Sequence, residues 1–306
     1  MFLPSVEDPS VDPILEAIDG EMASQKQPRV LLFDIGGVCV LSPFQAILDY
    51  ELSLGVPPGW VNYSISKSAP NGHWHRLEKG DIAIGQAFFD GFNKDIHDPA
   101  LWKTFYEREQ SKNVQLPKAI PPLPILDGES LFNEIMAKSH APDPWMYPAL
   151  QNLKESGNYI LGALSNTISF PPEHRFYTDD FFNDPLRKLF DVFISSAHVR
   201  VRKPDPKIYQ LAIKTLDKFA REKAGSTQGQ KLGWVAGITE SDILFFDDIG
   251  ENLRAAKEQG FGTFKINLGR TYEAVEELEK VTGLKLEGDR PKIPVKPSLL
   301  GLKARI

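Results

Sequence analysis

Cysteine is nearly absent from this chain of 306 residues, in which Cys39 is the single cysteine. One thiol cannot form a disulfide within the chain, so a disulfide-based fold is excluded and a reducing, cytoplasmic compartment is expected. Cys39 lies inside the apolar stretch Val30–Val40, where a small buried side chain is more common than a nucleophile. We therefore expect Cys39 to belong to the hydrophobic core.

Long hydrophobic runs are also lacking. No stretch reaches the roughly 18 apolar residues that a membrane-spanning helix requires, so no membrane partner is expected. Residues 1–28 contain early acids and prolines and no apolar segment typical of signal peptides, which predicts a poorly ordered leader. Residues 304–306, Ala-Arg-Ile, resemble a peroxisomal tripeptide only weakly, so the peroxisome is the second-ranked location after the cytoplasm.

The chain also lacks an excess of positive charge. The chain has 35 lysines and arginines against 41 acids, and its formal net charge is −6. A protein without a basic field is a poor candidate for binding nucleic acid or an anionic membrane. A small anionic substrate is still compatible with this charge, because a local site can be positive on an acidic protein. The sequence carries no signal for an oligomeric state.

Apolar runs that end in polar or glycine residues indicate buried strands. Near-continuous apolar runs are typical of parallel strands that are covered on both faces. Helical patterns at 205–225 and 251–260 lie between them, and this alternation predicts an α/β fold with a doubly wound parallel sheet. Ligands bind beyond the carboxyl ends of the strands in such sheets. The runs are 29–37, 159–167, 189–197, 242–252 and 262–268.

The segment 44–148 separates the first predicted strand from the second and is far longer than a normal crossover. It contains helical patterns at 79–96 and 128–140, so we predict an inserted helical domain. The α/β core then consists of residues 29–43 and 149–290, and residues 291–306 form an extended tail.

Acidic side chains follow two of the predicted strands. Asp34 precedes a glycine pair, while Asp247 and Asp248 end a later apolar run and are followed by Asn252. An aspartate at a strand end can be a nucleophile or a Mg²⁺ ligand, and adjacent carboxylates favour a cation or a shared proton between them. Each acid taken alone is as readily a helix-capping residue, so these residues leave both interpretations open.

Two further polar groups follow predicted strands. Ser165 and Asn166 come after the second strand, where hydroxyl and backbone N–H groups can hold a phosphate oxygen, although such turns are common. Lys203 precedes a proline just past the third strand and can neutralise a phosphate or a carboxylate nucleophile. A lysine taken alone is more often a solvated surface residue.

The four signals in this order are more specific than any one of them. The set FDxG, LSNT, KPDPKIY and FFDD followed by Asn252 resembles the haloacid dehalogenase-like (HAD-like) hydrolase superfamily, over residues 29–285. The chain is similar in particular to the N-terminal phosphatase-like domain of soluble epoxide hydrolase, through residues 72–88, 245–266 and 274–286. It has no G-x-S-x-G-like nucleophile elbow, so the resemblance does not support epoxide hydrolysis by a second, α/β-hydrolase domain.

The resemblance implies a Rossmann-like HAD core with a mobile cap, and Mg²⁺-dependent hydrolysis of small phosphate esters through a phosphoaspartate. Asp34 would be the nucleophile and Lys203 would offset the charge between Asp34 and the phosphate. Ser165 and Asn166 would bind the phosphoryl group. The implied metal ligands are Asp34, the carbonyl of Gly36, Asp248 and the neighbouring Asp247, with Asn252 supporting them.

Gly36 departs from the common pattern of the superfamily, which has a general-acid aspartate at this position. Such an acid contributes about 10²–10⁴-fold, and glycine cannot supply it. His73 and His75 in the predicted cap loop are candidate replacements because histidine titrates near neutral pH, although exposed loop histidines are common.

Three functions follow from this departure and stay open. The first is phosphate-ester hydrolysis with another proton source. The second is chemistry on a non-phosphate small molecule, such as epoxide opening or rearrangement in secondary metabolism. The third is ligand binding without turnover. Retention of Asp34, Lys203, Asp247 and Asp248 together argues against a purely structural protein, because buried acids that repel one another are costly.

Overall fold

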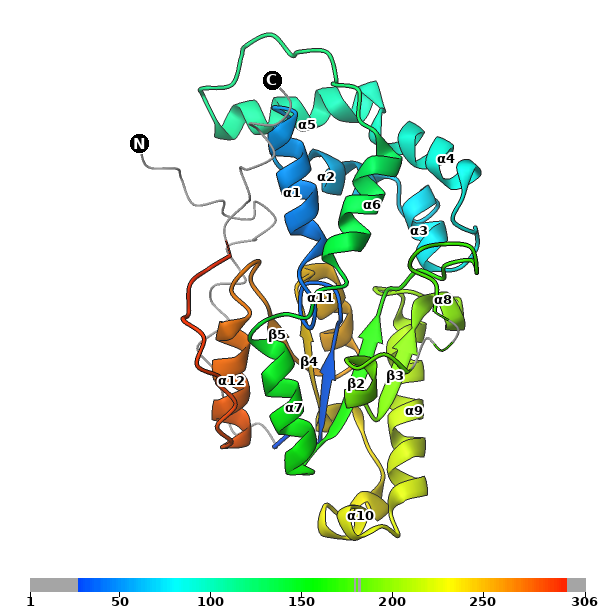
Figure 1. The fold of residues 1–306 in the computed structure, drawn as a ribbon, viewed down its shortest axis with the longest axis vertical. Helices are drawn as coiled ribbons and strands as arrows, with labels where there is room; N and C mark the ends of the chain where they lie inside the picture. The colour runs from blue at the N-terminus through cyan, green and yellow to red at the C-terminus, as the bar shows by residue number, and fades with distance from the viewer. Residues whose placement is uncertain (1–26, 179, 181–182, 296–306) are drawn as a thin grey trace.

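The computed structural model describes residues 27–178, 180 and 183–295. Within these residues, five parallel strands form one sheet in the order β3-β2-β1-β4-β5, and helices cover both of its faces (Figure 1). The predicted doubly wound parallel α/β fold is therefore confirmed. The strands are β1 (Val30–Phe33), β2 (Ile160–Ser165), β3 (Val192–Ser195), β4 (Ile243–Asp247) and β5 (Gly262–Lys265).

The central strand β1 explains why the apolar runs are nearly continuous. All four of its residues are fully buried, and it pairs with β2 on one side and with β4 on the other. Leu31 and Phe33 join one hydrophobic cluster, while Val30 and Leu32 join another, because successive strand residues point to opposite faces. The covering helices are α7 (Met146–Ser156) and α12 (Tyr272–Thr282) for the first cluster, and α9 (Pro206–Lys223) and α11 (Gly250–Glu258) for the second.

Local sequence sets the start of α9, the longest of these helices. Asp205 accepts a hydrogen bond from the Lys207 backbone N–H at 2.9 Å, and Pro206 occupies the first turn, where its missing N–H costs nothing. Shorter helices α8 (Ser196–Val199) and α10 (Thr227–Lys231) lie on either side of it in the chain. Single 3₁₀ turns occupy Arg187–Leu189, Trp234–Ala236 and Glu240–Asp242.

The chain between β1 and β2 forms a group of helices above the carboxyl ends of the strands (Figure 1). These helices enclose their own hydrophobic cluster, rich in aromatic side chains and separate from the two clusters of the sheet. The helices are α1 (Pro43–Ser53), α2 (Trp60–Lys67), α3 (His73–Glu78), α4 (Gln86–Ile96), α5 (Pro99–Lys112) and α6 (Gly128–Lys138). The proposed boundaries between core and cap stay a prediction.

One helical prediction was too long. The pattern at 79–96 predicted a single helix, but α4 begins only at Gln86. Gly80 has a φ of +69°, and a Cβ at this position would lie 2.9 Å from the Ala197 carbonyl oxygen. The left-handed backbone and the close approach end α3 here, and an amphipathic pattern alone does not reveal them.

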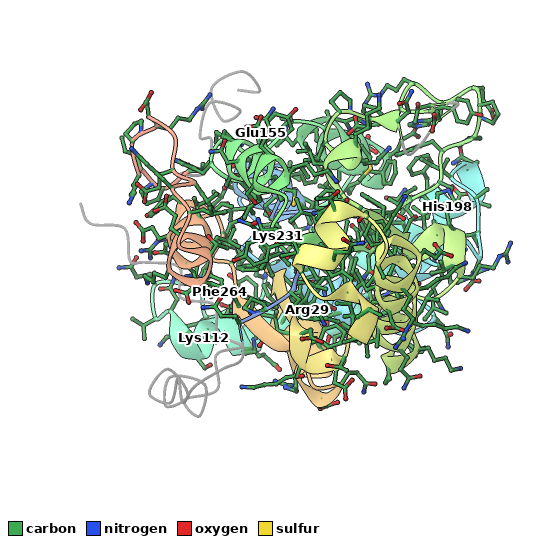
Figure 2. All side chains as sticks on the ribbon, turned by 90° about the horizontal axis from the view of Figure 1, so that it is seen from below. Arg29, Lys112, Glu155, His198, Lys231 and Phe264 are labelled. Carbon is green, nitrogen blue, oxygen red and sulfur yellow. The ribbon has the colours of Figure 1, made fainter. Side chains whose placement is uncertain are left out.

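The predicted leader 1–28 and tail 291–306 lie largely outside the described residues, as does the C-terminal tripeptide. Among the helices that the structure describes, none combines the length and the apolar character needed to cross a membrane. Arg29 and Lys231 are seen from below in Figure 2, at the end of the sheet opposite the helical group. Arg29 donates hydrogen bonds there to the carbonyl oxygens of Gly237 and Gly233.

Glu51 on α1 is a buried carboxylate inside the helical group. Its two oxygens accept hydrogen bonds from the backbone N–H groups of Gly59 and Val61, both at 2.7 Å, at the start of α2. Burial nevertheless raises the pKa of Glu51 to about 7, and the two hydrogen bonds oppose that rise. The carboxylate therefore links α1 to α2 at an electrostatic cost.

The raised pKa predicts a pH-dependent stability. Between its unfolded pKa near 4.5 and its folded pKa near 7, Glu51 ionises more readily in the unfolded chain, so rising pH favours unfolding. A slope of about 1.4 kcal/mol per pH unit gives a total loss on the order of 3 kcal/mol. Glu51→Gln is expected to flatten the decline in unfolding free energy between pH 5 and pH 8, measured by urea denaturation. Glu155→Gln, on the exposed face of α7, serves as the control, and equal slopes in wild type and Glu51→Gln would contradict the assignment.

Candidate active site

The carboxyl edge of the sheet brings two predicted acids together. Asp34 directly follows β1, and its backbone N–H donates to the Phe246 carbonyl at 2.8 Å, while Asp247 is the last residue of β4. Because β1 and β4 are parallel neighbours, both side chains emerge at the same edge of the sheet. Both are buried, with exposed fractions of 6% for Asp34 and 0% for Asp247.

Lys203 lies between these two acids. Its Nζ is 2.9 Å from Asp34 Oδ1 and 2.7 Å from Asp247 Oδ2, and the side chain is fully buried. Burial by itself lowers the pKa of the lysine, but the Asp247 and Asp34 carboxylates outweigh that effect and raise it. Lys203 is thus held as a cation inside the protein, so for this residue the interpretation as a solvated surface lysine is wrong.

Asp247 is fixed by a buried hydrogen-bond network. Its oxygens accept from the Asn252 side-chain amide at 3.2 and 3.1 Å and from the Ile249 N–H at 2.7 Å. The Tyr209 hydroxyl donates in turn to the Asn252 carbonyl at 2.9 Å. Asn252 thus contacts Asp247, and its supporting role at a metal site stays a prediction. Tyr209 was not among the predicted site residues.

Asp248 completes a cluster of carboxylates with Asp34 and Asp247. One oxygen of each lies within 4.8 Å of the others. Burial and the neighbouring carboxylates raise the pKa of Asp248, and burial likewise raises that of Asp247. Three carboxylates and the Lys203 ammonium leave two formal negative charges, which a divalent cation would neutralise. An all-oxygen set of this kind suits a hard cation such as Mg²⁺.

The two glycines after Asp34 have different constraints. Gly37 has a φ of +76°, and a Cβ there would lie 2.3 Å from Asp248 Oδ2, so this position requires glycine. A Cβ on Gly36 would make ordinary contact with the Pro43 ring, at 3.6 Å from Cδ. The backbone therefore accommodates a Cβ at Gly36, so glycine is not required there by its backbone.

The predicted phosphate-binding pair lies at the end of β2. Ser165 is 3% exposed and is the last residue of the strand, beside β1 in the sheet. Both ends of the Asn166 side-chain amide bond the backbone of Lys203. Phosphoryl binding by Ser165 and Asn166 stays a prediction, and for Asn166 it falls to the backbone N–H.

The two candidate cap acids lie on helix α3 rather than in a loop. His73 Nδ1 is 3.0 Å from Asp95 Oδ2. His75 is buried, and burial together with the positive charges of Arg202 and Lys79 lowers its pKa to about 4. A histidine with so low a pKa is neutral at pH 7 and is a poor replacement for a general acid, so the prediction for His75 is not supported.

Contacts between the helical group and the sheet domain were missed at the sequence level. The Arg202 guanidinium, next to Lys203, lies 2.8 Å from Glu78 Oε2, and the Ser196 hydroxyl donates to the Glu78 carbonyl at 2.6 Å. The partners are more than a hundred positions apart in sequence, so no local pattern could indicate them. The aromatic residues Phe88 and Phe92 of α4 are fully buried within the helical group, which favours packing over substrate contact.

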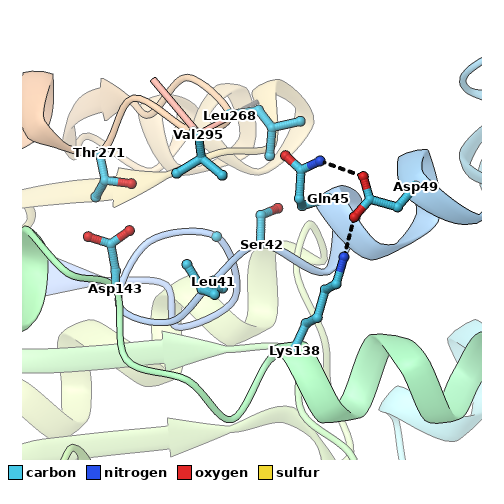
Figure 3. Close-up of a pocket in the computed structure, with 11 residues that line it drawn as sticks. Leu41, Ser42, Gln45, Asp49, Lys138, Asp143, Leu268, Thr271 and Val295 are labelled. Atoms are coloured by element: carbon cyan, nitrogen blue, oxygen red, sulfur yellow. Dashed lines mark hydrogen bonds and ion pairs between the residues drawn. The ribbon is translucent and has the colours of Figure 1, made fainter. Parts of the chain in front are cut away.

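A cavity of about 190 Å³ adjoins Gly37 in the loop after β1 (Figure 3). Gly37 contributes to its wall, and the Gln45 amide, Asp49 and Lys138 form a chain of polar contacts along one side. The cavity lies where the segments that connect the helical group to the sheet domain meet the loop after β5. The lining residues are Gly37, Leu41, Ser42, Gln45, Asp49, Lys138, Asp143, Leu268, Gly269, Thr271 and Val295.

Curated proteins with similar sequences are longer than this chain. It is 27% identical over 259 residues to Acyl-CoA dehydrogenase family member 10 of Mus musculus, an alignment that covers 84% of this chain and 19% of that protein. It is 25% identical over 264 residues to Bifunctional epoxide hydrolase 2 of Sus scrofa, covering 84% of this chain and 39% of that protein. The chain thus spans about two fifths or less of the length of these relatives.

No protein-family model matches the chain. Among solved structures, a HAD-like family hydrolase of Porphyromonas gingivalis aligns with a TM-score of 0.45 and 18% identity, covering 83% of this chain and 98% of that chain. A dehalogenase aligns with a TM-score of 0.45 and 18% identity, covering 84% and 97%. The sequence resemblance to the epoxide hydrolase that the motifs predicted is confirmed over 84% of this chain.

Proposed function

We propose that this protein is a Mg²⁺-dependent hydrolase of small phosphate monoesters that works through a phosphoaspartate at Asp34. The observation that carries the proposal is the buried Lys203 ammonium held between Asp34 and Asp247, with Asp248 beside them. A strand-end carboxylate next to a fixed cation is suited to attack an anionic phosphoryl group, because the cation offsets the repulsion between the two.

The carboxylates of Asp34 and Asp248 and the Gly36 carbonyl would hold the metal, with Asp247 alongside. When bound, Mg²⁺ would offset the negative charge of the phosphoryl oxygens. The three carboxylates and the Lys203 ammonium carry a formal charge of −2 together, which supports this assignment. Lys203 neutralises only one of the three carboxylates, and a divalent cation would neutralise the other two.

Asp34 Oδ1 accepts from the Ile35 N–H at 2.7 Å and lies beside Lys203, so we assign the attack to Oδ2. A bond forms from Oδ2 to phosphorus as the ester P–O bond breaks, and the leaving oxygen takes a proton. Water then attacks phosphorus in the acyl phosphate, which releases phosphate and restores the carboxylate. The Ser165 hydroxyl would hold a phosphoryl oxygen.

Proton supply to the leaving oxygen is the weak point of this site. Gly36 has no side chain, His75 has a pKa near 4, and His73 lies against Asp95. The proton then comes from solvent, which favours esters whose leaving groups are stable as anions. We therefore infer a preference for aryl phosphates or other activated phosphates over simple alkyl phosphates.

The helices α1–α6 would act as a cap that closes over the bound ester and excludes water. The ion pair between Glu78 on α3 and Arg202 joins them to the segment that carries Lys203.

Hydrolysis of a panel of aryl and alkyl phosphate monoesters tests the proposal. We expect turnover with Mg²⁺, loss of turnover with EDTA, and faster turnover of aryl than of alkyl esters. Asp34→Asn is expected to lower kcat by at least about 10³-fold, because an amide is a far weaker nucleophile. Asp90→Asn on the exposed face of α4 is the matched control. Full turnover by Asp34→Asn would sink the nucleophile assignment.

Restoring the missing acid gives a second prediction. Gly36→Asp is expected to raise kcat for alkyl phosphates by about tenfold or more and to change aryl phosphate turnover less, because only the poor leaving groups need a proton. Gly36→Ala adds the Cβ without the carboxyl group and is expected to give no gain. Equal gains on both ester classes would contradict the acid's proposed role.

A second candidate function is chemistry on a non-phosphate small molecule, in which Lys203 and a bound metal would act as electrophiles. Gly36 is the observation that favours it, since the acid is missing although a Cβ at this position would make only ordinary contacts. Absence of turnover across the whole phosphate panel, together with no gain in Gly36→Asp, would favour this candidate over phosphate hydrolysis.

A further inference from the structure

The Asn166 side chain makes an unusual pair of contacts. Its Oδ1 accepts from the Lys203 backbone N–H at 2.9 Å, and its Nδ2 donates to the Lys203 carbonyl oxygen at 3.1 Å. The two residues are 37 positions apart, and Asn166 directly follows β2. One amide thus bonds both polar main-chain groups of a single distant residue.

The backbone at Lys203 needs such a support. Lys203 lies between the end of α8 and the start of α9, in a stretch that the structure places in neither a helix nor a strand. Its side chain has four rotatable carbon–carbon bonds, yet Nζ must lie within 2.9 Å of Asp34 and 2.7 Å of Asp247. A side chain this flexible reaches a fixed point only if its own backbone is fixed.

The geometry points to Asn166 as a positioning residue for Lys203: we propose that its amide fixes the main chain from which the lysine reaches the two carboxylates. The effect on catalysis rests on the proposed phosphatase function, whereas the effect on Lys203 does not. Because Oδ1 and Nδ2 both bond the backbone of Lys203, the proposed effect of the side chain is exerted through that residue.

The kinetic test uses Asn166→Ala and an aryl phosphate substrate. Loss of the clamp is expected to lower kcat by about 10- to 100-fold, since displacing a catalytic group by about 1 Å costs up to that much. KM is expected to change less than about threefold. Asn158→Ala, at the other end of β2 with its side chain bonded to Lys231, is the matched control and is expected to retain wild-type kinetics.

Chemical labelling of lysines tests the same proposal without any turnover. Lys203 is fully buried, whereas the Lys218 side chain is 73% exposed, so acetylation followed by mass spectrometry should modify Lys218 far faster. Asn166→Ala is expected to raise the rate at Lys203 by about tenfold or more, while Asn158→Ala leaves it unchanged. The thiol of the fully buried Cys39 reports any global opening of the core.

The outcomes separate cleanly. A higher KM with unchanged kcat and a still-protected Lys203 would overturn the proposal, as would unchanged kinetics with a protected Lys203. If the wild type turns over no phosphate ester, the proposed function fails and the labelling rates alone decide the role of Asn166. If Cys39 also becomes reactive in Asn166→Ala, then Asn166→Asp, which keeps the acceptor for the Lys203 N–H, replaces it and is judged by the same labelling rates.

Discussion

The buried ammonium of Lys203 is the interaction on which this site depends. Without it, Asp34 and Asp247 would be two uncompensated carboxylates in the interior, and removing one partner of a buried charge pair typically costs about 3–5 kcal/mol. The surrounding groups hold the carboxylates and the lysine at fixed distances. Asn252 and the Ile249 N–H orient Asp247, and the parallel pairing of β1 with β4 sets the spacing of the two acids.

The negative charge of the cluster is not explained by a contribution to stability. A well-packed apolar group would stabilise the sheet edge at least as well as an ion pair, so three acids gathered around one lysine have little structural justification. Burial first, and then the neighbouring carboxylates, raise the pKa values of Asp247 and Asp248. Gly37 adds a further constraint, because its left-handed backbone lets the Asp248 carboxylate approach the loop closely. These features agree with the proposed site for a cation and an anionic group.

The contact between the helical group and the sheet domain lies next to Lys203 in the chain. Arg202 binds Glu78 on α3, and the next residue, Lys203, reaches into the carboxylate cluster. The backbone of that segment is in turn bonded by the Asn166 amide at the end of β2. A movement of the helices would therefore reach the segment that carries Lys203 through the ion pair between Glu78 and Arg202.

The sequence by itself determined the five strands, the doubly wound sheet and the strand-end acids Asp34 and Asp247, because apolar runs that end in charged residues are local patterns. It indicated Lys203 only through the family resemblance, because a single lysine before a proline is not a specific signal. Tertiary structure decided what the neighbouring side chains do. Asn166 bonds a residue 37 positions away, and His75 is buried beside Arg202, where desolvation and positive charge depress its pKa. These outcomes depend on which distant segments meet, and packing fixes that rather than any spacing along the chain.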